Sequence, residues 1–211
     1  MKYKLLNKSI INKRLDDFRF QTARTDALIH LSVLGLLVGV LTSIVLTFFI
    51  FCVNSALALW LPQNTSDNFE SLNLASRLLA PVLGSMILLL IFKLIAKDND
   101  GVGVVNVLER LRYHDGLIKA RSLLLQFIGA AVALVSGHSV GREGPAIHMG
   151  SAVGSLLGQQ LKLPHNSVRT LLACGSAAAI SAAFNTPLAG VIFAMEVIVV
   201  EYSFALSLIH I

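Results

Sequence analysis

Long stretches without a charged side chain constrain this chain more than any other feature of its sequence. Residues 27–66 contain no Lys, Arg, Asp or Glu over 40 positions, and further uncharged stretches cover residues 122–141, 144–161 and 170–195. A helix that crosses the hydrocarbon core of a bilayer needs about 20 mainly apolar residues. Soluble domains have about 25% charged residues, whereas this chain has 14% and is 55% hydrophobic. We therefore predict an all-α, polytopic membrane protein.

The apolar segments differ in length, and the differences predict helices of several kinds. Ile29–Leu61 supplies one long, tilted span, whereas Leu78–Phe92 is shorter. The later stretches are divided by Gly and Pro, and Arg142 and Glu143 stand between two of them. Charged residues at membrane depth are costly and usually functional, and transporters place interrupted helices at ion sites near the bilayer midplane. We expect tilted, broken and half-length helices.

Basic residues predict the orientation of the chain. Residues 1–24 contain seven Lys and Arg against two Asp, which accounts for the whole formal net charge of +5. Because Lys and Arg are enriched in cytoplasmic loops, residues 1–26 are expected to form a basic cytoplasmic segment, with residues 93–121 inside and 62–77 outside. Residues 27–211 are then a transmembrane domain, in an integral, multi-pass protein of the plasma (inner) membrane of a bacterium. A signal peptide is excluded, since its apolar region has only about 7–15 residues.

Several other classes of function are disfavoured. Aromatic residues are not interleaved with the basic N-terminal residues, so the lipid bilayer and not a nucleic acid is the expected partner. Cys52 and Cys174 lie in apolar runs, and His138 and His148 lack the spacing of metal ligands, so no metal or cofactor is expected. The absence of a visible nucleophile–base pair argues against an enzyme.

The strongest local signal is the segment Gly141–Pro145, which reads GREGP. Proline is favoured in the first turn of a helix, and glycine allows close approach of the backbone. Residues 146–158 are therefore expected to form a helix that begins at this loop. The first N–H groups of a helix and its dipole favour an anion. The carboxylate of Glu143 would compete with an anion for that place.

These residues resemble the GREGP motif of the CLC family of chloride channels and chloride/proton exchangers. Residues 184–196, FNTPLAGVIFAME, resemble the family's FN-x-PLAG segment and the helix after it that ends in Glu. The two motifs together cover about residues 130–202, and a weaker resemblance extends back to about residue 75. The resemblance implies that Glu143 is a gating glutamate and that a backbone cradle for the ion is formed by Gly141, Arg142, Gly144, Pro145 and Ala146.

A second cradle segment of the family reads GSGIP at the start of an earlier half-helix. The matching segment here reads GVGVV, so the resemblance assigns anion binding to Gly101, Val102, Gly103 and Val104. Valine cannot donate a hydrogen bond, so the backbone N–H groups alone would hold the ion, and the preferred anion stays open. Without the family, the segment is a glycine-rich turn. It is not a dinucleotide-binding fingerprint, because no third glycine follows at the required spacing.

Val197 bears on the transport mechanism. Exchangers of the family carry a proton-relaying glutamate directly after the residue that matches Glu196, and Val197 occupies that position. The resemblance therefore implies a passive chloride channel, with a proton-coupled chloride exchanger as the alternative. A third possibility, from another class, is a half-repeat membrane protein that does not transport.

The resemblance also covers only the first inverted repeat of the family's fold, incompletely. The later filter segments, including a tyrosine that contacts the ion, have no counterpart here, so the chain is expected to be the N-terminal portion of a longer protein. That full-length protein would be a homodimer. Within the repeat, glycines recur every four residues at Gly150, Gly154 and Gly158, which predicts a tightly packed helix face.

Overall fold

Every regular element of the computed structural model is helical within the residues that it describes, which are 28–61, 69, 72–95 and 101–198. The elements are α2 (Leu28–Trp60), α3 (Leu74–Ile95), α4 (Gly103–Tyr113), α5 (Ala120–Val135), α6 (Glu143–Gln160), α7 (His165–Phe184), α8 (Pro187–Phe193) and the π-helix η3 (Ala194–Ile198). The predicted all-α fold with long, broken and half-length helices is confirmed. The predicted basic segment 1–26 lies outside the described residues.

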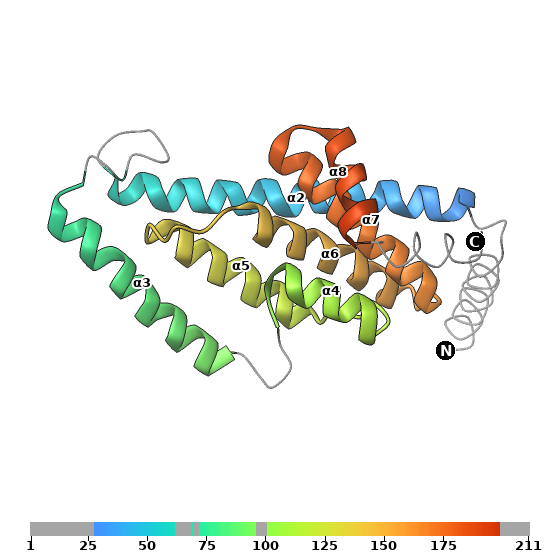
Figure 1. Ribbon diagram of the computed structural model, residues 1–211, viewed down its shortest axis with the longest axis horizontal. Helices are drawn as coiled ribbons and strands as arrows, with labels where there is room; N and C mark the ends of the chain where they lie inside the picture. The colour runs from blue at the N-terminus through green and yellow to red at the C-terminus, as the bar shows by residue number, and fades with distance from the viewer. Residues whose placement is uncertain (1–27, 62–68, 70–71, 96–100, 199–211) are drawn as a thin grey trace, which may run out of the picture.

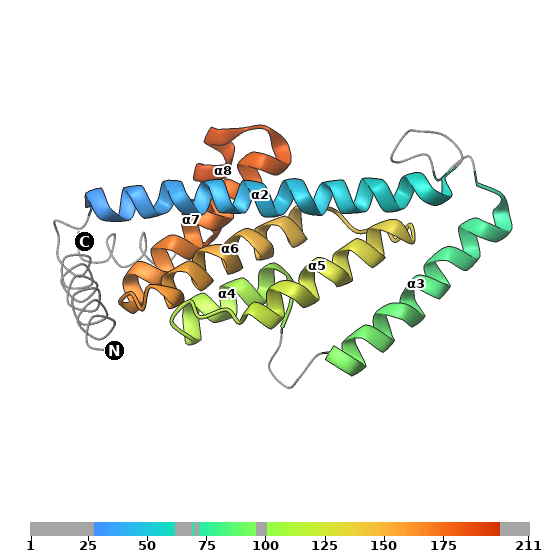
Figure 2. The same ribbon diagram turned by 180° about the vertical axis from the view of Figure 1, so that it is seen from behind.

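Three of the described helices are long and apolar enough to cross a membrane: α2, α3 and α7. Helix α2 runs along the whole bundle beside α6 and α7, whereas α3 diverges from the end of α2 (Figures 1 and 2). Only Gly84 is buried on α3, and leucines such as Leu78 and Leu89 remain more than 60% exposed. Such an apolar surface suits lipid or other protein as its environment and does not suit water.

The uncharged stretch 170–195 is divided between α7 and a second helical segment, which consists of α8 and the start of η3. Helix α7 ends at Phe184 because Asn185 adopts the left-handed conformation (φ 53°), which asparagine tolerates at a helix C-terminus. Pro187 then starts α8, where its missing N–H has no cost. A side chain at Gly190 would collide with Ser181 and the carbonyl of Ala177, so this glycine lets α8 fold back against α7. The FNTPLAG segment thus forms the turn between α7 and α8 and the start of α8.

Glycines bring α6 and α7 into close contact, as their spacing predicted. A Cβ at Gly150 would collide with the carbonyl oxygen of Gly175, and a Cβ at Gly175 with that of Gly150. One turn along α6, a Cβ at Gly154 would collide with the carbonyl oxygen of Leu171. A Cβ at Gly158 would lie 3.0 Å from the side chain of Val168. This backbone-to-backbone contact is the largest helix interface of the described chain.

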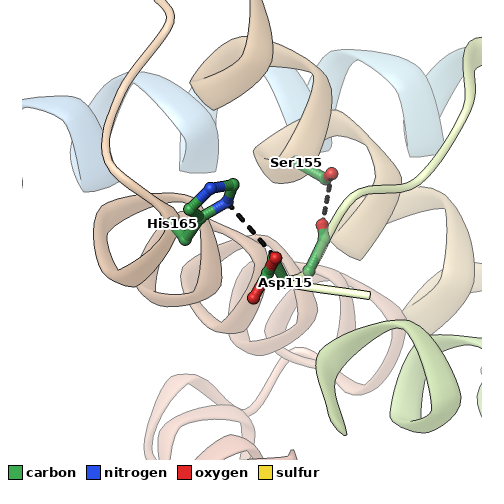
Figure 3. A network of polar contacts seen from close by, with 4 residues as sticks. Asp115, Ser155 and His165 are labelled. Carbon is green, nitrogen blue, oxygen red and sulfur yellow. Dashed lines mark hydrogen bonds and ion pairs between the residues drawn. The ribbon is translucent and has the colours of Figure 1, made fainter. Parts of the chain in front are cut away.

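The α4–α5 turn is fastened to α6 by one serine. Ser155 donates to the carbonyl of Gly116 (2.6 Å) and accepts from the N–H of Ile118 (2.9 Å). Figure 3 shows this contact beside the pair formed by Asp115 and His165, in which Nδ1 lies 3.7 Å from Oδ2. Because both partners of that pair are exposed, the buried serine holds the turn more firmly than the ion pair does.

Candidate functional site

The GREGP segment forms the start of α6. The helix begins at Glu143 itself, and Pro145 is its third residue, which confirms that the proline lies in a first turn. Arg142 precedes the helix and provides no side-chain cap. Helix starts leave their first N–H groups without intrahelical partners. Pro145 and Ala146 are buried, whereas Gly141 and Glu143 are exposed.

The side chain of Glu143 lies against the backbone of Gly141. A Cβ at Gly141 would collide with Oε2 of Glu143, so only glycine leaves room for the carboxylate in this position. At Gly144, by contrast, a Cβ would meet nothing within 4 Å. A side chain at the first glycine of the motif would therefore displace the carboxylate, whereas the second glycine is not required by packing in the described chain.

A cavity of about 300 Å³ opens beside Glu143. Its lining combines the loop before α6 with the ends of α2 and α5 and with the segment between α2 and α3: Leu57, Phe69, Leu134, His138, Val140, Gly141, Arg142 and Glu143. His138 is held in place by Ser136 Oγ at Nδ1 and by Ser85 Oγ at Nε2, each at 2.9 Å. The carboxylate of Glu143 thus lies between a polar cavity and the start of a helix.

The second predicted cradle, residues 101–104, forms the start of α4. Val102 precedes the helix in an extended conformation (φ −128°, ψ 164°) and makes no side-chain cap. Gly103 has φ +81°, a region that favours glycine. A Cβ at Gly101 would collide with the amide of Asn106. Both glycines of GVGVV are therefore required by the local geometry.

A buried polar network connects α4, α5 and α6 just behind the two helix starts. Ser122 Oγ of α5 donates to the carbonyl of Gly101 and lies 3.3 Å from Nε2 of His148 on α6. The same nitrogen lies 3.4 Å from Oδ1 of Asn106 on α4. His148, Ser122 and Asn106 are all at least 95% buried. The network holds the first two turns of α4 and α6 in a fixed relation.

Asn106, Ser122 and Gln126 were not singled out from the sequence. Gln126 of α5 accepts a hydrogen bond from the N–H of Gly103 through Oε1, at 2.6 Å. A signal was present, because Ser122 and Gln126 are spaced four apart in an otherwise apolar stretch and so share one helix face. The partners of His148 lie 26 and 42 residues away, so no spacing along the chain indicates them.

Val197 and Glu196 lie in η3 and have different surroundings. Glu196 is exposed. Val197 is partly buried and packs against the apolar cluster that contains Val107 of α4, Ile147 of α6 and Leu172 of α7. The position that the resemblance links to proton relay is therefore occupied by a packing residue, next to the two helices that form the candidate site.

Comparison with known proteins agrees with these motifs. Residues 83–211 match the model of the family described as voltage gated chloride channel. The chain is 34% identical over 170 residues to an H(+)/Cl(-) exchange transporter ClcA of Vibrio cholerae, covering 77% of this chain and 35% of that protein. It is 34% identical over 127 residues to a putative chloride channel protein ClcB-like of Ralstonia nicotianae, covering 58% and 30%.

A solved structure shows the same arrangement of helices. The chain superposes on a CLC-type fluoride/proton antiporter with a TM-score of 0.67 and 28% identity, over 82% of this chain and 41% of that one. The chain thus spans about a third of the length of the curated relatives. The motifs, the helix arrangement and the family match agree: this chain belongs to the voltage-gated chloride channel (CLC) family, a family of membrane transport proteins and not of enzymes.

Proposed function

We propose that the protein containing this chain conducts small monovalent anions, chloride first among them, with Glu143 as its gate. The observation that carries the proposal is the pairing of two helix starts, α4 and α6, whose N-cap residues Val102 and Arg142 provide no side-chain cap. One buried network links the two starts, and a carboxylate lies at the second. Each start presents backbone N–H groups and the positive end of a helix dipole. The residues assigned to the cradle are Gly101, Val102, Gly103, Val104, Gly141, Arg142, Gly144, Pro145 and Ala146.

Anion selectivity is the first expected result. The full-length protein, reconstituted in liposomes, should release chloride detected by an electrode, while potassium stays inside, because helix starts attract negative charge and repel cations. An equal leak of potassium, or no anion flux from folded protein, would contradict the proposal. The second of these outcomes would favour a half-repeat membrane protein that does not transport.

Transport is expected to be passive, because Val197 cannot carry a proton. A chloride gradient should give a reversal potential that does not move when a pH gradient is imposed. The alternative is proton-coupled exchange, which is favoured by the names of relatives, an H(+)/Cl(-) exchange transporter and a fluoride/proton antiporter. A reversal potential that shifts with the pH gradient in a constant anion-to-proton ratio would establish that alternative.

The proposed topology places the N-terminus in the cytoplasm. The α4–α5 turn and the α6–α7 turn lie together at one end of the bundle, as the contact of Asp115 with His165 shows. That end contains Lys119 and Lys162, in accord with the enrichment of basic residues on the cytoplasmic side. Residues 27–211 would then be one transmembrane domain of a homodimer in the plasma membrane of a bacterium.

A further inference from the structure

The start of α4 already has an acceptor bound to it. Val102 makes no side-chain cap, but the N–H of Gly103 donates to Oε1 of Gln126 at 2.6 Å, across 23 residues of sequence. Gln126 is only 8% exposed. The hydrogen bond determines the orientation of the carboxamide, since only its oxygen can accept from an N–H group.

The amide nitrogen of Gln126 has no hydrogen-bond acceptor among the described residues. Nε2 of Gln126 makes no hydrogen bond to any described residue. One turn earlier on the same face of α5, Ser122 holds the carbonyl of Gly101. Helix α5 therefore holds both polar groups of this turn, and the donor that remains unused belongs to a side chain that is more than nine-tenths buried beside the helix start.

We propose that Gln126 competes with the transported anion for the N–H of Gly103 and thereby selects for anions that are strong hydrogen-bond acceptors. This inference rests on the proposed anion transport. A hydrogen bond to an ionised acceptor is about twice as strong as a neutral one, so a small halide displaces the amide oxygen and then gains Nε2 as a donor. A large ion with diffuse charge, such as thiocyanate, gains too little to displace it.

Two kinds of substitution test this role in the full-length protein in liposomes: one removes the competing oxygen, and the other makes it a stronger acceptor. Gln126→Met removes the competing oxygen at similar volume, so the ratio of thiocyanate to chloride flux should rise roughly two- to tenfold, the equivalent of one net hydrogen bond. Gln126→Glu provides a charged acceptor, so chloride flux should fall by about tenfold or more near neutral pH. Because Glu143 is itself proposed to gate the flux with pH, recovery on acidification is measured in the Glu143→Gln background, where flux is otherwise nearly independent of pH. Gln126→Leu is a second apolar variant, and the same rise in the ratio of thiocyanate to chloride flux is expected from it.

The matched controls are Gln160→Met and Gln160→Glu, at an exposed glutamine at the far end of α6, which should leave both fluxes unchanged. A merely structural role for Gln126 predicts that the apolar and acidic variants lower both fluxes together, with an unchanged ratio and no recovery in acid. That result, or unchanged flux in every variant, overturns the inference while wild-type chloride flux upholds the proposed function. Wild-type protein without anion flux overturns both.

Discussion

Replacing Glu143 with Gln in the full-length protein is expected to give anion flux that is larger at neutral pH and nearly independent of pH. The carboxylate lies in the first turn of α6, where we propose that it competes with an anion for the same N–H groups. A hydrogen bond to a charged group contributes about 1.5–3 kcal/mol. Loss of the charge should therefore increase anion access by roughly ten- to a hundredfold, measured as chloride efflux between acidic and neutral pH.

Two further substitutions separate the charge of Glu143 from its position. Glu143→Asp keeps the charge on a shorter side chain, so flux should remain gated by pH but with altered rates. Gly141→Ala places a methyl group where Oε2 now lies, so the carboxylate must move while its charge is retained. Both variants should keep a pH dependence that Glu143→Gln lacks.

A matched control is Glu109→Gln, at an exposed glutamate in the second half of α4. This variant should retain the flux and pH dependence of the wild type. If folded Glu143→Gln protein had the same rate and the same pH dependence as the wild type, the gating role of Glu143 would have to be abandoned.

Replacing Gly154 with Ala should cost about 3 kcal/mol or more and leave little folded protein. The added methyl collides with the carbonyl oxygen of Leu171, which belongs to helix backbone and cannot turn aside. Overpacking a well-packed core typically costs about 1–3 kcal/mol. The cost here should lie at the upper end of that range, because helix backbone cannot move aside as a side chain can. Stability in detergent, followed as the fraction of monodisperse protein after heating, measures the effect.

Gly39→Ala is the matched control, and we expect it to leave the stability of the protein unchanged or to increase it. Gly39 also lies inside a long helix, α2, but a Cβ there meets nothing within 4 Å. Alanine favours a helix interior over glycine by about 1 kcal/mol, so this variant should match or exceed the wild type. Equal stability of the two variants would show that the α6–α7 contact is looser than the structure has it.

The sequence by itself determined the membrane class, the family and the positions of the helix starts. Uncharged stretches of 18 to 40 residues have no place in a soluble fold, and Pro145 and Pro187 mark helix starts because proline costs nothing there. Glycine spacing on α6 predicted a close contact, since only small residues let two backbones approach. These features are local, and they depend on few neighbours.

Only the tertiary structure decided which polar groups meet behind the two helix starts. The partners of His148 lie on α4 and α5, and the N–H of Gly103 finds its acceptor 23 residues away on Gln126. No periodicity specifies such contacts, because they depend on how three helices cross. The close approach of α8 to α7 at Gly190 was likewise decided by atoms brought together in space, since a Cβ there would collide with Ser181 and the carbonyl of Ala177. Hydrophobic pattern and turn-forming residues can be recognised from neighbouring positions in the sequence. A site built from buried hydrogen bonds between distant residues forms only once the helices have packed.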